Sequence, residues 1–563
     1  MIILFILSAI LLYAEDNLSL FRQYYRNKAY QEAYELLPSL VNQKYKDEMI
    51  YLSFGDVYFE MEKYDSARIM YQYAYDIRDD REEIIVKLAR AYSYTKDVTK
   101  AVKLLKDFLK KNNDSWLCNL ELGYVYLRAD SLKQAEYYIA KARDLNKKNA
   151  EPLVALGDLY FTQKVYELAR MNYEDALAIN PDLTDARVKL ATAYYWLANK
   201  EADENLSNEL FTRSLKEWQI VSQKDPKNAK AWFEQGKILF LARRFEDAAR
   251  AFFQYVQLRP NNALARWFLA QSLVEIGKCD SAVTHLEFVI KELDSVRTSA
   301  ELKLARCYYD NQDFAKSVEV YNKIKRQNEP LENRDYERLA SSYLRLGDTT
   351  AALNVYDELL SKNSNECGLS YQVGMLAFVA KKYTEAIKFF TMSNQRCSDT
   401  IQAKANFYLG NSYLNLSLPD SAIIYLTKSI ELDSLNPLTY IYRGDAYSNL
   451  NMKTKAKEDF LTAIKIINTN SNESNKRFLS AAFGKLCSLL FELKDSKELL
   501  KVSKNWSEFE PNSESPWIYT AIAYQIQKDL TNACKSWKKV LQINPKNKIA
   551  NEYYNQLKCG ESQ

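Results

Sequence analysis

The sequence predicts an all-α solenoid made of helical hairpins that return at a fixed spacing. The same pattern of small, aromatic and proline residues occurs fifteen times, mostly at intervals of 34 residues. A unit of this size buries its apolar face only against its neighbours, so the units must stack. The repeats begin near Ala14, Glu48, Glu82, Trp116, Ala150, Thr184, Ala229, Ala263, Thr298, Asn333, Cys367, Ala403, Pro437, Ser480 and Glu514.

The most regular feature is a small residue at position eight, counted from the first residue of each repeat. Position eight is Gly or Ala in thirteen of the fifteen repeats, and seven of the twelve glycines of the chain stand there. A glycine inside a helix costs roughly 0.5–1 kcal/mol relative to alanine. We therefore expect a second helix to approach closely at this point. Position twenty, which is Ala in twelve repeats, is expected to supply the partner.

Tyrosine and proline complete the pattern. Position eleven is Tyr in eleven repeats, and a proline stands at position thirty-two of several repeats, as in Pro181, Pro260, Pro511 and Pro545. Because proline cannot continue the interior of a helix, it ends one hairpin and starts the next.

This pattern resembles the tetratricopeptide repeat family, whose signature contains W-x2-L-G-x2-Y, then A-x3-F, then P. The repeat from Ala150 shows it in Leu156, Gly157, Tyr160 and Pro181. The resemblance covers nearly the whole chain. It implies a right-handed superhelical solenoid of about fifteen helix-turn-helix repeats over residues 15–546.

A few segments depart from the repeat pattern. About eleven extra residues lie around 199–210, and the polar tract 468–475 is expected to be an exposed loop. The repeat from Ser480 is degenerate, with Cys487 at position eight and Leu499 at position twenty. Residues 547–563 are expected to form a C-terminal cap helix and tail, because a stack of repeats needs a solvated end.

Residues 1–14 are expected to be a signal peptide. Ile2–Tyr13 is apolar apart from one Ser, and it is followed by Ala14 and the acidic pair Glu15 and Asp16. This run is shorter than the roughly 20 residues that span a bilayer, but it matches the apolar core of a secretory signal. We expect export to the bacterial periplasm or outer envelope, without a transmembrane segment in the mature chain. A non-functional signal would leave the protein in the cytoplasm.

Charge and motifs narrow the classes of function. Lys and Arg total 77 against 73 for Asp and Glu, a net charge of +4 that gives nucleic acid no electrostatic reason to bind. No phosphate-binding loop, dinucleotide fingerprint, zinc-protease motif or nucleophile elbow occurs, so neither catalytic residues nor a cofactor are expected. His285 is the single histidine, and no metal site is expected.

Eight cysteines are compatible with export, which permits disulfides. Cys367 and Cys397 stand at adjacent ends of one predicted hairpin. Cys534 begins the second helix of the last repeat, and Cys559 follows the predicted cap helix. We expect these two pairs to form disulfides, with Cys279–Cys307 as a looser third pair; the alternative is that they are buried thiols.

The resemblance also implies where a partner binds. In tetratricopeptide repeat proteins the first helix of each pair lines a concave groove, with positions two, five, nine and twelve facing inward. These positions give Phe59, Arg90, Tyr124, Phe161, Tyr195, Phe233, Lys237, Phe240, Trp267, Arg306, Tyr309, Tyr371, Phe378 and Phe407. The densest set, with Lys230 and Gln271 added, comprises Lys230, Phe233, Lys237, Phe240, Trp267 and Gln271, followed by Arg306 and Tyr309. Each aromatic residue could instead serve packing.

Three functions remain open at this stage. The first is a non-enzymatic protein-protein interaction scaffold of the cell envelope, which binds a peptide segment, an amphipathic helix or a folded domain of another protein. The second is a solenoid that binds a glycan or a small ligand, because exposed aromatic rings also stack on sugars. The third is an accessory subunit of an envelope enzyme.

Overall fold

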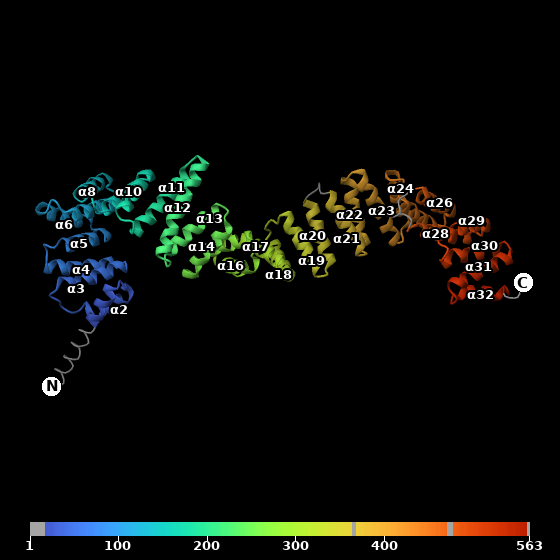
Figure 1. Ribbon diagram of the computed structural model, residues 1–563, viewed down its shortest axis with the longest axis horizontal. Coiled ribbons are helices and arrows are strands. Elements are labelled where there is room, and N and C mark those ends of the chain that lie inside the picture. Colours follow the sequence, from blue (N-terminus) through green and yellow to red (C-terminus); the bar gives the residue numbers. More distant parts are fainter. Residues whose placement is uncertain (1–16, 363–366, 470–476, 560–563) are drawn as a thin grey trace, which may run out of the picture. The chain divides into compact units, whose positions relative to one another are not determined.

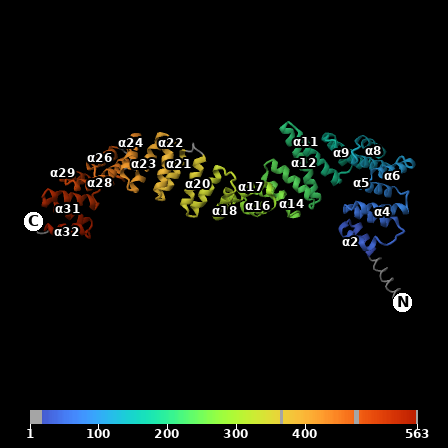
Figure 2. The ribbon, with the colours of Figure 1, turned by 180° about the vertical axis from the view of Figure 1, so that it is seen from behind.

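The computed structural model describes residues 17–362, 367–469 and 477–559, and within them the chain forms helices and no strand (Figures 1 and 2). The chain divides into two compact units, Met1–Arg297 and Thr298–Gln563, which are treated separately below. The expected signal peptide, residues 1–14, lies outside the described residues. Among the described helices, none has the length and apolar character needed to cross a membrane.

Unit 1 consists of successive helical hairpins, preceded by a helical stretch at residues 17–26. Its helices are α2 (Tyr30–Leu40), α3 (Glu48–Glu60), α4 (Tyr64–Ile77), α5 (Glu82–Tyr94), α6 (Val98–Lys111), α7 (Trp116–Arg128), α8 (Leu132–Leu145), α9 (Glu151–Thr162), α10 (Tyr166–Ile179), α11 (Thr184–Lys200), α12 (Glu204–Lys224), α13 (Ala229–Leu241), α14 (Phe245–Leu258), α15 (Ala263–Glu275), α16 (Cys279–Glu292) and the short 3-10 helix η1 (Asp294–Val296).

Unit 2 continues the same hairpin pattern. Its helices are α17 (Arg297–Asp310), α18 (Phe314–Arg326), α19 (Asn333–Arg345), α20 (Thr349–Lys362), α21 (Cys367–Val379), α22 (Tyr383–Arg396), α23 (Asp399–Asn415), α24 (Pro419–Leu432), α25 (Pro437–Asn449), α26 (Lys453–Thr469), α28 (Leu479–Glu492), α29 (Ser496–Phe509), α30 (Glu514–Ile526), α31 (Leu530–Ile543) and α32 (Lys548–Gln556).

The first helix of several hairpins starts at the first residue of a repeat and is capped by the side chain of the preceding residue. Side chains of Asp47, Ser115, Asn228 and Asn262 accept hydrogen bonds from backbone N–H groups of the following first turn. Such caps satisfy donors that otherwise have no partner at the start of a helix. The largest shift is in α23, which begins at Asp399, four residues before the Ala403 expected from the repeat spacing.

The described residues of the segments that depart from the repeat pattern are largely helical. The extra residues around 199–210 lengthen both helices of one hairpin, since α11 has 17 residues and α12 has 21. In the polar tract expected to be a loop, Asn468 and Thr469 instead end α26, and residues 470–475 lie outside the described residues. The degenerate repeat from Ser480 still forms a hairpin, with Cys487 and Leu499 fully buried.

Close packing inside each hairpin centres on the small residue at position eight. A Cβ added to Gly55 would lie 2.4 Å from Tyr71, and one added to Gly236 would lie 2.7 Å from Phe252. The large side chain in contact stands at position twenty-four. The expected partner, the alanine at position twenty, comes near through its backbone in the repeat of Gly123, where the carbonyl oxygen of Ala135 lies 3.4 Å from the added Cβ.

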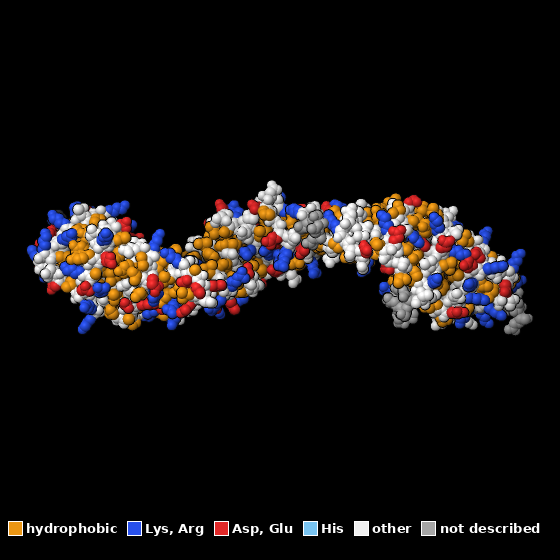
Figure 3. All heavy atoms as spheres, turned by 90° about the horizontal axis from the view of Figure 1, so that it is seen from above, with side chains coloured by type: hydrophobic (Ala, Val, Ile, Leu, Met, Phe, Trp, Pro, Cys, Tyr) orange, Lys and Arg blue, Asp and Glu red, His pale blue; other side chains and the backbone are white. Residues whose placement is uncertain are grey.

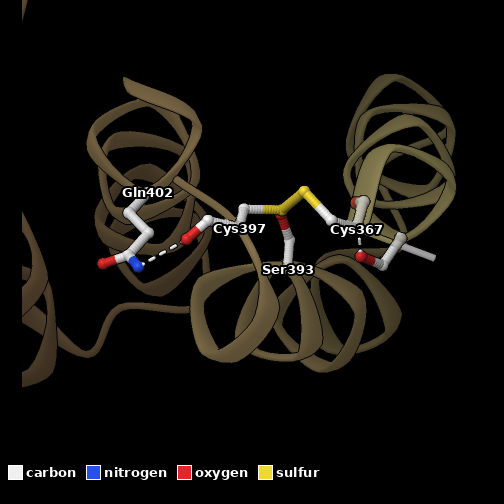
Figure 4. Close-up of a disulfide and its surroundings, with 5 residues drawn as sticks. Cys367, Ser393, Cys397 and Gln402 are labelled. Carbon is white, nitrogen blue, oxygen red and sulfur yellow. Dashed lines mark hydrogen bonds between the residues drawn. A yellow bond between two sulfur atoms is a disulfide. The ribbon is translucent and has the colours of Figure 1, made fainter. Parts of the chain in front are cut away.

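Two disulfides close parts of unit 2. Cys367 Sγ is bonded to Cys397 Sγ, which joins the start of α21 to the end of α22 (Figure 4). Cys534 is bonded to Cys559, which ties the segment after the cap helix α32 to α31. Cys279 and Cys307 are also disulfide-bonded cysteines; they belong to different units, and their pairing with each other stays a prediction.

Candidate functional site

The first helices of unit 1 form a hollow of about 540 Å³, called here the unit 1 hollow. Its lining comes from α3, α5, α7, α9 and α11 and the residue before α11, and none of it from second helices. Phe59, Arg90 and Tyr124, which the repeat positions place on the inner face, are among the lining residues. The other lining residues are Tyr94, Leu117, Leu120, Glu121, Leu127, Arg128, Glu151, Val154, Asp158, Leu183, Asp185, Ala186 and Lys189.

Ion pairs connect neighbouring first helices in a regular way. Position nine of one repeat meets position six of the next in the pairs Asp56–Lys87, at 2.8 Å, and Asp158–Lys189, at 2.9 Å. The repeat between them has the opposite polarity, with Arg90 at position nine 2.7 Å from Glu121 at position six. Each pair bridges two repeats, and the two pairs that line the hollow, Arg90–Glu121 and Asp158–Lys189, thereby also hold its helices together.

Glu121 is the most buried charge of the hollow, with 1% of its side chain exposed. It accepts hydrogen bonds from Nε and Nη2 of Arg90, and its other oxygen accepts from Nη2 of Arg128. These three charge-assisted hydrogen bonds offset the cost of burying the carboxylate. No hydrogen bond to either Nη1 is present among the described residues, so both guanidinium groups keep donors for another molecule.

Arg128 is held in place from two further sides. Its Nε donates to Ser93 Oγ at 2.7 Å, and its guanidinium lies over the ring of Tyr94, 4.8 Å from the ring centre. Tyr94 stacks on Tyr64 and meets Phe59 edge to face. The cationic end of the hollow therefore has a fixed geometry, because aromatic packing and the shared carboxylate both orient the guanidinium.

Asp158 organises the opposite end. One of its oxygens accepts from the Tyr173 hydroxyl at 2.8 Å, and the other accepts from Lys189 Nζ. Burial raises the pKa of the Asp158 carboxyl above its ordinary value despite the lysine. Lys189 is shared with the exposed Asp185, 2.9 Å away, and Glu151 forms no ion pair among the described residues. This end is anionic.

Tyr124 interrupts the ladder of ion pairs between the two ends. It stands at position nine, but position six of the next repeat is Ala155, which offers no polar side chain. The Tyr124 hydroxyl has no hydrogen-bond partner in the part of the chain that the structure describes, and burial raises the pKa of this phenol. Around it the floor is apolar, with Leu120 and Val154. A ligand would find one free hydroxyl in an apolar patch between two charged ends.

Unit 2 has a comparable hollow of about 560 Å³, lined mainly by α23, α25 and α28. It repeats the position-nine to position-six pairing, because Lys485 lies 3.0 Å from Asp445. Its lining is more polar, and includes Asn411, Asn415 and Asn449. Burial raises the pKa of Asp445, as it does for Asp158 in unit 1.

The densest cluster expected from the sequence serves mainly packing in unit 1. Phe233 meets the rings of Phe252 and Tyr255, and Phe240 meets Phe245 and Phe268. Trp267 is buried, with 8% of its surface exposed, so the ring has little area to offer a partner.

The polar members of that cluster remain partly accessible. Lys237 pairs with Glu234 at 2.9 Å and lies over the ring of Tyr195. Lys230 is exposed above Trp218, and Gln271 is half-buried. A role of these residues in partner binding stays a prediction.

In unit 2, Arg306 and Tyr309 both bridge to the next repeat. The Arg306 guanidinium donates to the fully buried Asp335, which also accepts from the Tyr321 hydroxyl. The Tyr309 hydroxyl lies 3.1 Å from Ser341 Oγ. These contacts stabilise the stacking of repeats, and the Arg306 side chain is 28% exposed.

Sequence reasoning missed Glu121, Asp158 and Lys189. Glu121 and Lys189 stand at position six, which the family pattern does not place on the inner face, and Asp158 is an acidic residue at position nine. A signal was present, because a Gly-Asp pair at positions eight and nine occurs in Gly55-Asp56, Gly157-Asp158 and Gly444-Asp445. Because position eight is small where the two helices meet, the acidic residue that follows it stands at the same place on the inner face in each of these repeats.

The described residues contain no group of His, Cys, Asp or Glu side chains that could hold a metal ion. On the face shown in Figure 3, basic and acidic side chains are interspersed with apolar ones. This mixture agrees with the nearly balanced composition of the chain.

Comparison with solved structures gives matches at low identity and low TM-score. The structure of Naa15/Naa10 bound to HypK-THB is 15% identical, covers 84% of this chain and 76% of that chain, and gives a TM-score of 0.34. A tetratricopeptide repeat protein from Parabacteroides merdae is 16% identical, covers 46% of this chain and 98% of that chain, and gives a TM-score of 0.33.

Curated relatives are equally distant. Superkiller protein 3 of Saccharomyces cerevisiae is 24% identical over 364 residues, which are 57% of this chain and 25% of that protein. Tetratricopeptide repeat protein 21B of Xenopus laevis is 23% identical over 332 residues, 55% of this chain and 25% of that protein. The match thus spans about a quarter of the length of each. A TPR repeat-containing protein of Methanocaldococcus jannaschii is 21% identical over 64% of this chain and 71% of its own length.

Family models described as tetratricopeptide repeat match seven segments of the chain. One model matches residues 86–150, 199–263, 269–330 and 337–396, and a second matches residues 150–183, 403–434 and 439–470. These segments together make up more than half of the chain, and they overlap the helical hairpins described above. The chain therefore belongs to the tetratricopeptide repeat family.

Proposed function

We propose that this chain is a non-enzymatic scaffold of the bacterial cell envelope, which binds segments of other proteins along the first helices of its repeats. Tetratricopeptide repeat proteins bind other proteins. The observation that carries the proposal is the unit 1 hollow, because all of its lining except Leu183 comes from first helices of successive repeats. A surface that extends over several helices suits a chain segment, which can contact several repeats at once.

The chemistry of the hollow supports a protein segment as the ligand. Apolar side chains such as Leu117, Leu120 and Val154 form the floor, and charged groups with free hydrogen-bonding capacity stand around it. Protein interfaces combine an apolar centre with a polar rim in the same way. The ion pairs that line the hollow already hold these side chains in place without a ligand, so binding a segment costs little further side-chain conformational entropy.

Two features support a place outside the cytoplasm. The disulfides Cys367–Cys397 and Cys534–Cys559 are stable in an oxidising compartment and rare in a reducing one. The apolar run Ile2–Tyr13 at the start of the sequence matches a secretory signal. Export through a signal peptide and folding with disulfides are consistent with each other.

Site-specific photocrosslinking in intact cells tests the binding role. A photoreactive residue in place of Leu117, which lines the hollow, should crosslink to another protein that mass spectrometry identifies. The same residue in place of Lys103, which is exposed on the second helix α6, is the matched control. Equal crosslinking at both positions, or transfer only to polysaccharide, would reject the proposed site.

Cell fractionation tests the location. The mature protein should begin after Ala14 and should contain no free thiol at the four paired cysteines. Intact-mass measurement after thiol labelling reports both properties in one experiment. A cytosolic protein that retains Met1 and reduced cysteines would contradict the placement in the envelope, while leaving the crosslinking result unaffected.

A further inference from the structure

The two ends of the unit 1 hollow have opposite charge. At one end the guanidinium groups of Arg90 and Arg128 share the single carboxylate of Glu121, which leaves one positive charge in excess. At the other end Lys189 is shared by Asp158 and Asp185. Glu151 adds a further carboxylate there without an ion pair among the described residues. The hollow is therefore polarised along the succession of helices from α5 to α11.

The middle of the hollow differs from both ends. Leu120 and Val154, with 4% and 8% of their surfaces exposed, provide a small apolar floor between them, and the Tyr124 hydroxyl is free to donate a hydrogen bond. This is the one step from α3 to α11 at which position nine has no charged partner at position six. A ligand with an apolar group at this point would bury it without displacing an ion pair.

We propose that the unit 1 hollow binds an extended protein segment that carries an acidic, an apolar and a basic side chain in succession. The acidic side chain lies against Nη1 of Arg90 and Arg128, the apolar side chain covers Leu120 and Val154, and the basic side chain lies near Glu151 and Asp185. A backbone carbonyl of the segment accepts from the Tyr124 hydroxyl. This inference rests on the proposed function and adds the chemical class and orientation of the bound segment.

Helix geometry sets the spacing of the two charges on the segment. Packed helices lie roughly 8–10 Å apart, and the two charged ends are separated by one step, from α7 to α9, to three steps, from α5 to α11, which is about 8–30 Å. An extended chain advances about 3.3 Å per residue, so the acidic and basic residues stand roughly three to nine residues apart. A segment with both charges on adjacent residues cannot reach the two ends.

Synthetic peptides test the inference directly on the full-length protein. Fluorescent probe peptides carry Asp, Leu and Lys in this order or the reverse, with Gly-Ser spacers that give each of these separations. Matched peptides replace Asp, Lys or both with Ser. Fluorescence anisotropy should show that replacing either charge weakens binding by about two- to fivefold, the range for accessible ion pairs. One order of Asp and Lys should bind more tightly than the other.

A charge reversal in the protein separates specific binding from loss of folding. Glu151→Lys changes an exposed side chain without an ion pair, so the fold is retained. The variant end then has two carboxylates against two lysines, so a peptide with Lys there should bind no more tightly than the matched peptide with Ser. Asp175→Lys, on the exposed face of the second helix α10, is the control and should leave the preference for Lys unchanged. Loss of this preference with retained binding of the Ser peptide cannot arise from unfolding.

Removal of one hydroxyl tests the centre of the hollow. Tyr124→Phe keeps the ring and should weaken binding of the best peptide severalfold, with unchanged thermal stability, because this hydroxyl has no partner in the protein. Peptide binding that ignores charge and Tyr124 would overturn the inference. If the peptide tests fail but photocrosslinks to another protein form at the Leu117 position, the scaffold proposal still stands. If no such photocrosslinks form, the scaffold proposal fails whatever the peptides show.

Discussion

A Cβ added to Gly157 would lie 2.3 Å from Cε1 of Tyr173, so α9 and α10 meet with no space for one further methyl group. The ring cannot move aside freely, because its hydroxyl donates to Asp158 at 2.8 Å. Packing inside the hairpin is thereby linked to the charge at the anionic end of the unit 1 hollow.

Gly157→Ala is expected to destabilise this hairpin by about 1–3 kcal/mol, the usual effect of overpacking a close contact. Hydrogen exchange of α9 and α10 measures the loss locally, which suits an array that does not unfold as one unit. Gly368→Ala is the control, because a Cβ at Gly368 meets no atom within 4 Å. Equal protection of α9 and α10 in the Gly157→Ala variant and the parent would show that the helices can separate.

The repeat spacing made much of the fold predictable. Start residues of α3, α7 and α13 follow from it, because a capping residue precedes the first residue of each of these repeats and small residues recur at fixed positions. The partner of position eight was not predictable in the same way. In the repeat from Ala150, position eight is Gly157, which packs against Tyr173 at position twenty-four. In the repeat from Thr298, the same two positions hold Ala305 and Tyr321. A tyrosine at position twenty-four therefore does not by itself set the residue at position eight; the distance between the two helices decides how small that residue must be.

The candidate site could be predicted only in part. Arg90 and Tyr124 follow from their inward positions, but the ladder of ion pairs depends on distances between repeats that no single repeat contains. For Trp267, the same inward position gives a buried ring, because neighbouring helices cover it. Helical periodicity identifies a face, and the packing of adjacent repeats decides which residues on that face stay accessible.

Turn geometry between the two helices of a repeat leads to a second prediction. Position fifteen has a positive φ in fourteen repeats, although it is glycine only at Gly277 and Gly347. Lys164 is exposed and has a φ of 60°, a left-handed backbone conformation that is unfavourable for a residue with a Cβ atom. Lys164→Gly is expected to stabilise its hairpin by about 0.5–1 kcal/mol, since the relief of strain exceeds the added entropy of the unfolded glycine.

The reverse substitution provides the control. Gly277 has a φ of 72° and open space around it, so Gly277→Ala should destabilise its hairpin through backbone conformation alone. Chemical denaturation monitored by circular dichroism, with hydrogen exchange to localise the change, measures both effects. Shifts of the same sign in the two variants would show that the turn is not strained.

The single histidine gives unit 1 a defined pH dependence. Burial and the neighbouring Arg266 lower the pKa of His285 below the ordinary value of 6.5. Arg266 Nη1 lies 3.3 Å from Nδ1 of His285, which accepts a hydrogen bond only when that nitrogen carries no proton. Because the unfolded chain binds the proton more tightly, stability falls as the pH decreases through 6.5 towards the lower folded pKa, and is fully present above 6.5.

His285→Gln should remove this part of the pH dependence. Thermal unfolding of the parent and the variant between about pH 7 and 5 isolates the histidine, because only its titration differs between the two proteins. Asp158, whose pKa is raised by burial, acts in the opposite sense: its contribution to stability falls as pH rises through its folded pKa. That contribution is common to both proteins and cancels in the comparison. Parallel pH profiles would show that His285 is accessible to water in the folded protein.

The disulfide between Cys367 and Cys397 allows a prediction about local stability in unit 2. The bond closes 30 residues of chain, and crosslinks over loops of this size typically contribute about 2–4 kcal/mol. Ser393 Oγ lies 3.2 Å from Cys397 Sγ, and Gln402 donates to the carbonyl oxygen of Cys397, so this end of the bond stays ordered after reduction (Figure 4). The loss is therefore expected mainly at Cys367, where α21 begins.

Reduction should raise the hydrogen-exchange rate of amides in α21 by about 30- to 1,000-fold, which corresponds to the expected 2–4 kcal/mol. The double variant Cys367→Ser and Cys397→Ser should show the same rates with or without reductant. That comparison separates the effect of this bond from that of Cys534–Cys559, which remains intact in the oxidised double variant. If α21 exchanges equally in the oxidised parent and the oxidised double variant, packing against α22 alone holds the helix, and the disulfide serves only to resist full unfolding.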